Sequence, residues 1–330
     1  MPVIGRRECD VSLTSSRRWP ITGSMNGYVL SAEGLWGEEL EVRLVSSALS
    51  LPLGNQAALA RVARLCAATS ATPQGIALEA ARDEGFAALL LRLANAAASM
   101  PVSRVADLPS AVRRLGTSLV QALAVAAPGL RLLQGPADGL TPARHELHRH
   151  AVRVGLAARL LAPATVDPEQ ALTAGLLHNI GLNVVSLYLP NEFRALLDAA
   201  ARGEQLWPLE EEVLGFTHSA LGARLAEGWS YPVELTMAIR DHDSGCPENE
   251  LGAVVELADV LVRAYGVGVE APRPLPALLP ASTAGLERAE AQLQTLLEAQ
   301  DRFDVRMDSE TIEFPAPAPE VFSAALRQLR

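Results

Sequence analysis

The sequence contains no lysine, so all 28 basic residues among its 330 are arginine. Walker-type phosphate loops, Schiff-base enzymes and kinase-like phosphate grips each depend on an ammonium group, and these classes are therefore excluded. Acidic residues number 38, which gives a net charge of -10. Because nucleic-acid binding relies on surplus positive charge, we do not expect nucleic acid as a partner.

Cysteine is also scarce. Cys9, Cys66 and Cys246 lie far apart and form no CxxC pair, which is typical of a reducing compartment. The first ten residues carry charge without an apolar segment, and charged residues or histidine interrupt every later apolar run before it is long enough to span a membrane. We therefore expect a cytoplasmic protein without a membrane span.

The composition changes along the chain and predicts four segments. Residues 1–47 form an N-terminal extension, in which Leu40–Val45 (LEVRLV) roughly alternates between apolar and polar residues, as a half-buried strand does. Residues 48–266 carry a helical pattern almost throughout. Residues 267–282 form a proline-rich connector, and residues 283–330 form a C-terminal extension.

The C-terminal extension has the pattern of a helix over 284–303, a short hairpin over 303–314 and a last helix over 319–329. The apolar residues of the first helix are spaced to bury one face. That face packs either on its own domain or on a second copy of the chain. A homodimer is therefore one of two alternatives.

The central segment predicts an all-α bundle, because its helix boundaries are well punctuated. Thr72, Thr141 and Asp167 each precede a proline and are predicted to cap a helix. No fixed period is found, so the pattern indicates one compact helical domain and not a repeat array. The predicted helices cover residues 85–99, 108–127, 142–162, 169–188, 208–215, 217–229, 232–242 and 251–265.

All six histidines lie between residues 145 and 242. His145 and His148 are surrounded by charged residues and are predicted to lie on an exposed face. His178 lies in the apolar sequence GLLHNIG, and Asp259 lies in VVELADVLVRAYG. Polar groups in such surroundings need a partner. For Asp259 that partner is either a metal or Arg263, four residues later on the same helix.

Five segments resemble, in order, the HDOD domain, an all-helical relative of the HD phosphohydrolases and the HD-GYP cyclic-dinucleotide phosphodiesterases. They are LLLRLANAAAS (89–99), GLLHNIGLNVV (175–185), EEEVLGFTHSALGARLAEGWSYP (210–232), IRDHDSG (239–245) and ELADVLVRAYG (256–266). The resemblance covers roughly residues 51–266. It implies a helical bundle of the HD/HDOD type, flanked by the small β-containing N-terminal extension and the C-terminal α(+β) extension.

The resemblance also implies a remnant metal site for a divalent transition metal or iron. The positions that match the family's ligand pattern are His150, His178, Asn179, His218, His242, Asp243 and Asp259. Two of them depart from it, because Asn179 replaces the aspartate of the His-Asp doublet and Asp243 replaces a second histidine. Leu182 also stands where catalytic relatives carry a phosphate-gripping lysine.

The loss of the doublet carboxylate weakens the case for catalysis, because that group bridges two cations and helps to acidify the attacking water. The resemblance therefore implies a non-catalytic signal-transduction module that acts through contacts with signalling proteins. The alternative is a metal-dependent phosphohydrolase or cyclic-dinucleotide phosphodiesterase with an altered ligand set. A metal that is held without turnover is an intermediate case.

Overall fold

The computed structural model describes residues 35–51, 54–96, 105–132, 138–245 and 247–270. Within these ranges every regular element is an α-helix and no strand occurs, which confirms the predicted all-α fold. The described helices are α1 (Glu38–Leu49), α2 (Gln56–Ala67), α3 (Pro73–Ala80), α4 (Glu84–Ala96), α5 (Leu108–Leu115), α6 (Thr117–Arg131), α7 (Thr141–Leu161), α8 (Pro168–Leu177), α9 (Ile180–Tyr188), α10 (Pro190–Ala201), α11 (Leu206–Val213), α12 (His218–Gly228), α13 (Val233–Asp241) and α14 (Glu250–Ala264).

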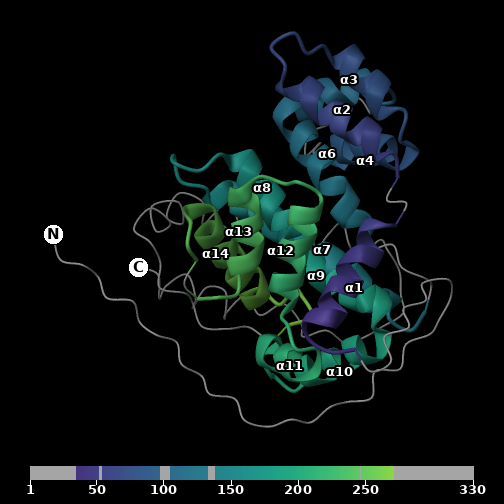
Figure 1. The fold of residues 1–330 in the computed structure, drawn as a ribbon. Helices are drawn as coiled ribbons and strands as arrows, with labels where there is room; N and C mark the ends of the chain where they lie inside the picture. The colour runs from purple at the N-terminus through teal and green to yellow at the C-terminus, as the bar shows by residue number, and fades with distance from the viewer. Residues whose placement is uncertain (1–34, 52–53, 97–104, 133–137, 246, 271–330) are drawn as a thin grey trace.

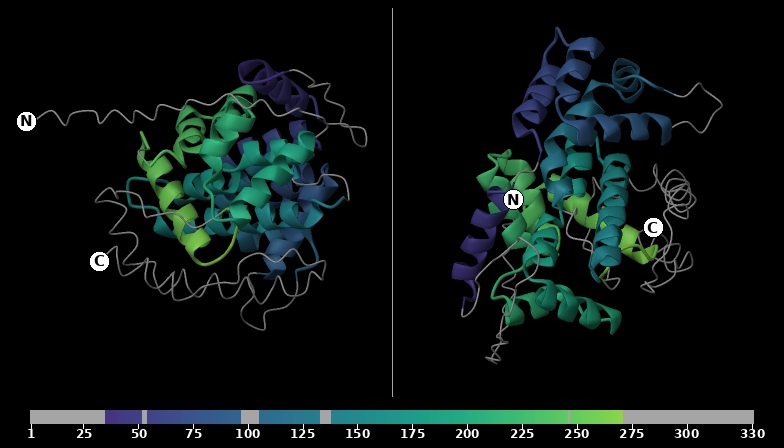
Figure 2. Two further views of the ribbon diagram at one scale, coloured as in Figure 1. Left: turned by 90° about the horizontal axis from the view of Figure 1, so that it is seen from below. Right: turned by 90° about the vertical axis from the view of Figure 1, so that its right-hand side faces the viewer.

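The helices form two groups that share one hydrophobic core (Figure 1). Helices α2 to α6 make the first group, and α7 to α14 make the second. Helix α6 joins the groups because it packs on α2 and also on α8. Figure 2 shows α1 beside the second group, where it packs on α12, although α2 follows it in the chain.

The segment Leu40–Val45, predicted as a strand, lies inside α1, so the expectation of a small N-terminal β element is wrong. Leu40, Leu44 and Ala48 are fully buried, while Val42 is 51% exposed. A spacing of four residues between buried positions is the helical period. Over only six residues, the helical period resembles the imperfect alternation of a strand. The buried Ala48, four residues after Leu44, shows that the period is helical.

Side-chain capping explains several of the helix starts. Thr72 and Asp167 cap α3 and α8, because their side chains accept hydrogen bonds from the backbone N–H groups of Gly75 and Glu169. The prediction for Thr141 is wrong, since it is the first residue of α7 and its hydroxyl instead accepts from the backbone N–H of Asp138.

Two predicted single helices are each divided in two. The helix predicted over 108–127 is divided at Gly116, whose φ of 82° is a left-handed conformation that stops a helix. The helix predicted over 169–188 is divided at His178 and Asn179, between α8 and α9. The predictions for residues 1–34 and 271–330, which include the hairpin, the terminal helices and most of the proline-rich connector, lie outside the described residues.

One described stretch, Pro168–Tyr188, has the length and apolar composition of a membrane span. Its apolar window is entirely buried inside the protein. The core helices of globular domains pass the same test. We therefore assign it to the core, where α8 and α9 pack between the other helices of the second group.

Two close helix crossings depend on paired glycines. A Cβ atom on Gly175 of α8 would lie 2.6 Å from the Cα atom of Gly155 on α7. One on Gly181 of α9 would lie 2.0 Å from the carbonyl oxygen of His218 and 2.9 Å from the backbone nitrogen of Gly222, both on α12. No real Cβ atom tolerates such contacts. The residues between Gly175 and Gly181 are thereby held against two other helices.

We expect Gly181→Ala to lower the free energy of unfolding by about 3 kcal/mol, because the new methyl group meets backbone atoms that cannot rotate away. Gly139→Ala is the matched control, since its added Cβ would come no closer than 3.4 Å to the guanidinium end of Arg194. Urea denaturation of the two variants measures the difference. Equal stability of the two variants would contradict the crossing.

A buried ion pair closes the first group. Asp83, 5% exposed, pairs with Arg131 at the end of α6. Its carboxylate also accepts hydrogen bonds from the backbone N–H groups of Asn55 and Phe86, at 2.8 and 2.9 Å. Burial alone would raise the pKa of Asp83, but Arg131 and the two N–H donors outweigh it and hold this pKa below its ordinary value.

We expect Asp83→Asn to destabilise the protein by about 1–3 kcal/mol at neutral pH, because it removes the charge that Arg131 and two N–H groups bind. A lowered folded-state pKa stabilises the fold above the unfolded pKa of about 3.9, and this contribution is lost as the pH falls through the folded value. The stability difference between wild type and variant should therefore shrink in acid. Asp198→Asn, at an exposed position of α10, is the control; a pH-independent difference for Asp83→Asn would contradict the assignment.

Candidate metal centre

Four histidines from different helices meet inside the second group. His150 lies on α7, His178 follows α8, His218 begins α12 and His242 follows α13. None is more than 2% exposed. Their rings form a row, with neighbouring centroids 5.1, 4.9 and 5.3 Å apart from His150 through His178 and His242 to His218.

Each imidazole is oriented by the partner of its Nδ1 atom. The Nδ1 atoms of His150, His178 and His242 face the backbone carbonyls of Val267, Gly175 and Ile239 at 3.0, 2.7 and 2.8 Å. A carbonyl only accepts, so all three Nδ1 atoms carry a proton and donate it. Their Nε2 lone pairs are consequently directed into the common space between the helices.

The fourth imidazole is oriented by a carboxylate. The Nδ1 atom of His218 lies 2.8 Å from both carboxylate oxygens of Glu210, which is fully buried. One of these oxygens also accepts a hydrogen bond from the backbone N–H of His218. A carboxylate behind a metal-binding histidine fixes the ring and raises its basicity.

The Nε2 atoms and two aspartates form two groups, which we call the first trio (His150, His178 and Asp259) and the second trio (His218, His242 and Asp243). In the first trio, the Nε2 atom of His150 lies 3.2 Å from that of His178 and 2.9 Å from Oδ1 of Asp259. In the second, the two Nε2 atoms are 3.3 Å apart and lie 3.2 and 3.5 Å from Oδ2 of Asp243.

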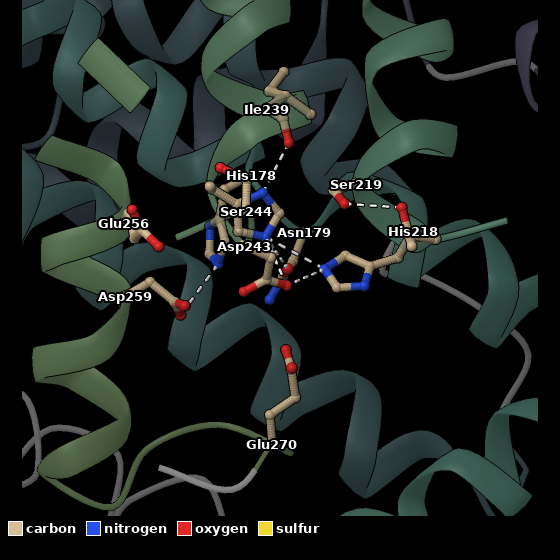
Figure 3. Close-up of polar contacts among 12 residues, drawn as sticks. His178, Asn179, His218, Ser219, Ile239, Asp243, Ser244, Glu256, Asp259 and Glu270 are labelled. Carbon is tan, nitrogen blue, oxygen red and sulfur yellow. Dashed lines mark hydrogen bonds and ion pairs between the residues drawn. The ribbon is translucent and has the colours of Figure 1, made fainter. Parts of the chain in front are cut away.

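Asn179 adds one more oxygen to the second trio. Its Oδ1 atom lies 3.2 Å from Nε2 of His242. Figure 3 shows Asn179, Asp243 and His218 directed toward the same space, with Asp259 on its far side. All seven residues predicted from the sequence are therefore brought together, while His145 and His148 lie on the exposed face of α7, as predicted.

These donors fit a transition-metal ion. Neutral Nε2 atoms and aspartate oxygens are all acceptors, so their convergence at 2.9 to 3.7 Å is unfavourable unless a proton or cation lies among them. Metal–ligand bonds of about 2.1 Å place neighbouring ligands about 3.0–3.4 Å apart. Imidazole and carboxylate ligands suit zinc, iron, nickel and manganese. The described residues thus offer two groups that can each hold a metal.

The burial of the site separates the pKa values of its histidines. Burial lowers the pKa of His178, although Asp259 opposes the shift, and it lowers the pKa of His242 to about 3. Burial would also lower the pKa of His218, but the carboxylates of Glu210 and Asp243 outweigh it and raise this pKa well above its ordinary value. His178 and His242 are therefore neutral at pH 7, as metal ligands must be.

A buried arginine completes the site. Arg263, 2% exposed, lies one helical turn after Asp259 on α14. Its Nε and Nη2 atoms lie 2.8 Å from the two oxygens of Asp259, and its Nη1 atom donates to Glu270 at 2.7 Å. Burial alone would raise the pKa of Asp259, and Arg263 holds it well below its ordinary value. Of the two partners expected for Asp259 from the sequence, Arg263 is present, and the Nε2 atoms of His150 and His178 lie 2.9 and 3.7 Å from Oδ1 of Asp259.

Sequence reasoning missed Glu210, which stands in a run of three glutamates that resembles a solvated surface. Glu211 and Glu212 are exposed, but Glu210 lies between the buried Leu206 and Val213 on one face of α11. Spacings of four and three residues were the available signal. Glu270 was also missed, because it lies in the segment taken for a connector.

We expect Glu210→Gln to weaken metal binding roughly 10- to 100-fold, because the amide keeps the shape but loses the charge behind His218. Glu212→Gln is the matched control, since Glu212 is exposed on the same helix. Titration of the metal-free protein with Co²⁺, followed by its visible absorption, gives both affinities. Equal affinities of the two variants would contradict the role of Glu210.

Solved structures with the same fold come from several bacteria. An HDOD domain protein of unknown function from Geobacter sulfurreducens aligns with a TM-score of 0.60 and 21% identity, over 88% of this chain and 97% of that one. A protein named as a candidate phosphohydrolase from Shewanella amazonensis SB2B gives 0.59 and 20%, over 79% and 97%. One named as a candidate signal transduction protein from Marinobacter aquaeolei VT8 gives 0.59 and 19%, over 92% and 68%. At these identities the similarity concerns the fold.

Sequence comparison gives the family. An uncharacterized protein of Treponema pallidum (strain Nichols) is 33% identical over 167 residues, which are 49% of this chain and 31% of that protein. The match thus spans about a third of the length of this curated relative. The HDOD domain family matches residues 51–244, which include His150, the His178-Asn179 doublet, His218 and His242. The chain therefore belongs to the HDOD domain family.

Proposed function

We propose that the chain is a regulatory module that does not hydrolyse phosphate esters, and that a transition metal at the histidine cluster holds its helices together. The observation that carries the proposal is the set of converging Nε2 atoms, whose tautomers are fixed by backbone carbonyls. The ligands come from α7, α8, α12, α13 and α14 and their ends. An ion in either trio would therefore link helices that lie far apart in the sequence, as a structural metal does.

Two substitutions support the absence of catalysis. Asn179 offers one neutral oxygen where the catalytic relatives have a bridging carboxylate, so it contributes no charge to acidify a bound water. Leu182, in place of the phosphate-gripping lysine, is fully buried in the core. A leucine there can bind no phosphate.

The burial of the ligands points the same way. Histidines that are at most 2% exposed, together with a fully buried Asp259, leave little surface at which a phosphodiester can reach the centre. A catalytic metal site keeps an open position for water and substrate. A structural site is closed.

Residues 267–270 give the metal centre a connection to the rest of the chain. The carbonyl of Val267 accepts from His150, the N–H of Gly268 donates to Glu146 on α7 at 2.8 Å, and Glu270 pairs with Arg263. A change at the centre therefore moves the start of the segment that follows. Such a coupling suits a module that acts through contacts with signalling proteins, in a cytoplasmic setting, without nucleic acid or membrane as a partner and with a homodimer as one mode of contact.

The second candidate function is metal-dependent phosphohydrolysis, including that of cyclic dinucleotides. The observation in its favour is that both trios keep two histidines and an aspartate. A solved structure of the same fold also carries the name of a candidate phosphohydrolase.

Metal analysis and hydrolysis assays distinguish the two candidates. For protein purified without a histidine tag, we expect bound transition metal, which is lost in His218→Ala, and no turnover of bis(p-nitrophenyl) phosphate or cyclic dinucleotides with Mn²⁺ or Fe²⁺ added. Chelation should lower Tm by roughly 5–10 °C, because a ligand bound only to the native state stabilises it. His145→Ala, at an exposed position of α7, is the control for the substitution.

Turnover that disappears in His218→Ala would support the phosphohydrolase and overturn the regulatory proposal. Protein that contains no metal and takes up none would overturn the structural role of the metal. Asn179→Asp adds the missing carboxylate and should increase metal occupancy. An unchanged occupancy in that variant would count against Asn179 as a ligand position.

A further inference from the structure

Arg263 contacts both trios. Each aspartate of the trios lies between its own histidines and this guanidinium. In Asp259, Oδ1 lies 2.9 Å from His150 and Oδ2 lies 2.8 Å from Nη2 of Arg263. In Asp243, Oδ2 lies 3.2 Å from His218 and Oδ1 lies 3.5 Å from the same Nη2 atom.

We propose that Arg263 limits the centre to a single divalent cation, and that this cation is held by the second trio together with Asn179. The proposal rests on the metal binding proposed above. It concerns the number of ions and their place, which the presence of the two trios does not decide.

The positive charge of Arg263 carries the first part of the proposal. The guanidinium is fixed in place by three carboxylates, those of Asp259, Asp243 and Glu270. Its Nε donates to Oδ1 of Asp259 and its Nη2 lies 2.8 Å from Oδ2, so this ion pair already balances the charge of the carboxylate. A divalent cation in the first trio would lie close to a guanidinium in a site that excludes water, where repulsion between like charges is weakly screened.

The donor sets of the trios carry the second part. The first trio offers three donors, and its only carboxylate is shared with Arg263 at 2.8 Å. The second trio offers a fourth donor, the amide oxygen of Asn179, and its carboxylate lies 3.5 Å from Arg263. His218 also has the charged Glu210 behind it, while His150 and His178 are oriented by neutral carbonyls. Four donors and more negative charge favour the second trio.

The charge of Arg263 is consistent with a neutral amide at position 179. A carboxylate at position 179 would join two cations, whereas Arg263 is one cation that joins two carboxylates. The amide of Asn179 has no charge for a second ion to balance. Loss of one negative group and presence of a fixed positive group both lower the number of metal ions that the centre holds.

The test is the metal stoichiometry of Arg263 variants. Wild type should saturate at one Co²⁺ or Mn²⁺ per chain, and Arg263→Lys should as well, because it keeps the charge. Arg263→Met and Arg263→Gln should each bind two ions per chain, and EPR should then show spin coupling between the neighbouring Mn²⁺ ions. Arg240 is an exposed arginine that also pairs with carboxylates, those of Asp241 and Glu248. Arg240→Met is therefore the control and should still bind one ion per chain. Circular dichroism checks the folding of each variant.

A second pair of variants locates the ion without altering Arg263. His218→Ala should abolish binding of the single Co²⁺, while His150→Ala should retain it with an affinity within a few fold of wild type. Equal losses in the two variants would overturn the assignment to the second trio.

Two ions in wild type, or a single ion in folded Arg263→Met and Arg263→Gln, would overturn the role of Arg263 and leave the regulatory proposal standing. One ion combined with phosphodiester turnover would overturn the regulatory proposal and leave this one standing. Protein that binds no ion would overturn this proposal and the structural role of the metal together.

Discussion

The constraint on which the second group of helices depends is the exclusion of water from four imidazoles and two aspartates. When all four imidazoles are neutral, the inward-facing atoms are all acceptors, and a cluster of buried acceptors is unstable without a shared proton or cation. The protein fixes this arrangement from the outside, because backbone carbonyls at the ends of α8 and α13 and beyond α14 bind three Nδ1 atoms. The backbone therefore sets the orientation of three imidazole rings, and a movement of these helices changes the positions of their Nε2 atoms.

The break between α8 and α9 lets the backbone do this. An uninterrupted helix over these residues would bond its carbonyls four residues onward, whereas here the carbonyl of Gly175 accepts from the ring of His178. Gly175 lets the backbone of α7 come close to that of α8, and Gly181 lets the backbone of α12 come close to that of α9. Each approach brings one further histidine, His150 or His218, to the doublet. The glycines of GLLHNIG are thus as necessary to the centre as its histidine.

The sequence predicted the elements better than it predicted the surroundings of the site. Caps at Thr72 and Asp167 were readable because an oxygen followed by proline has a local meaning. The ligand positions were readable only through the family resemblance, since no two of them form a local chelate. The burial of individual side chains could not be predicted from the sequence. Glu210 belongs to a run of three glutamates, and only the tertiary structure buries one of them. The strand predicted for Leu40–Val45 was wrong because six residues are too few to distinguish the period of a strand from that of a helix.

Buried charges surround Asn179, and they constrain which of the residues at the centre can be replaced. Arg263, Glu210, Asp243 and Asp259 are each stabilised by a group of opposite charge or by a histidine. Removing one member of such a network leaves the others buried and unpaired, which costs more than the member itself contributes. Under the proposed function a carboxylate at position 179 would be balanced by metal, so the amide of Asn179 leaves no arginine of the network unpaired. The packing that these buried groups require is therefore independent of a carboxylate at position 179.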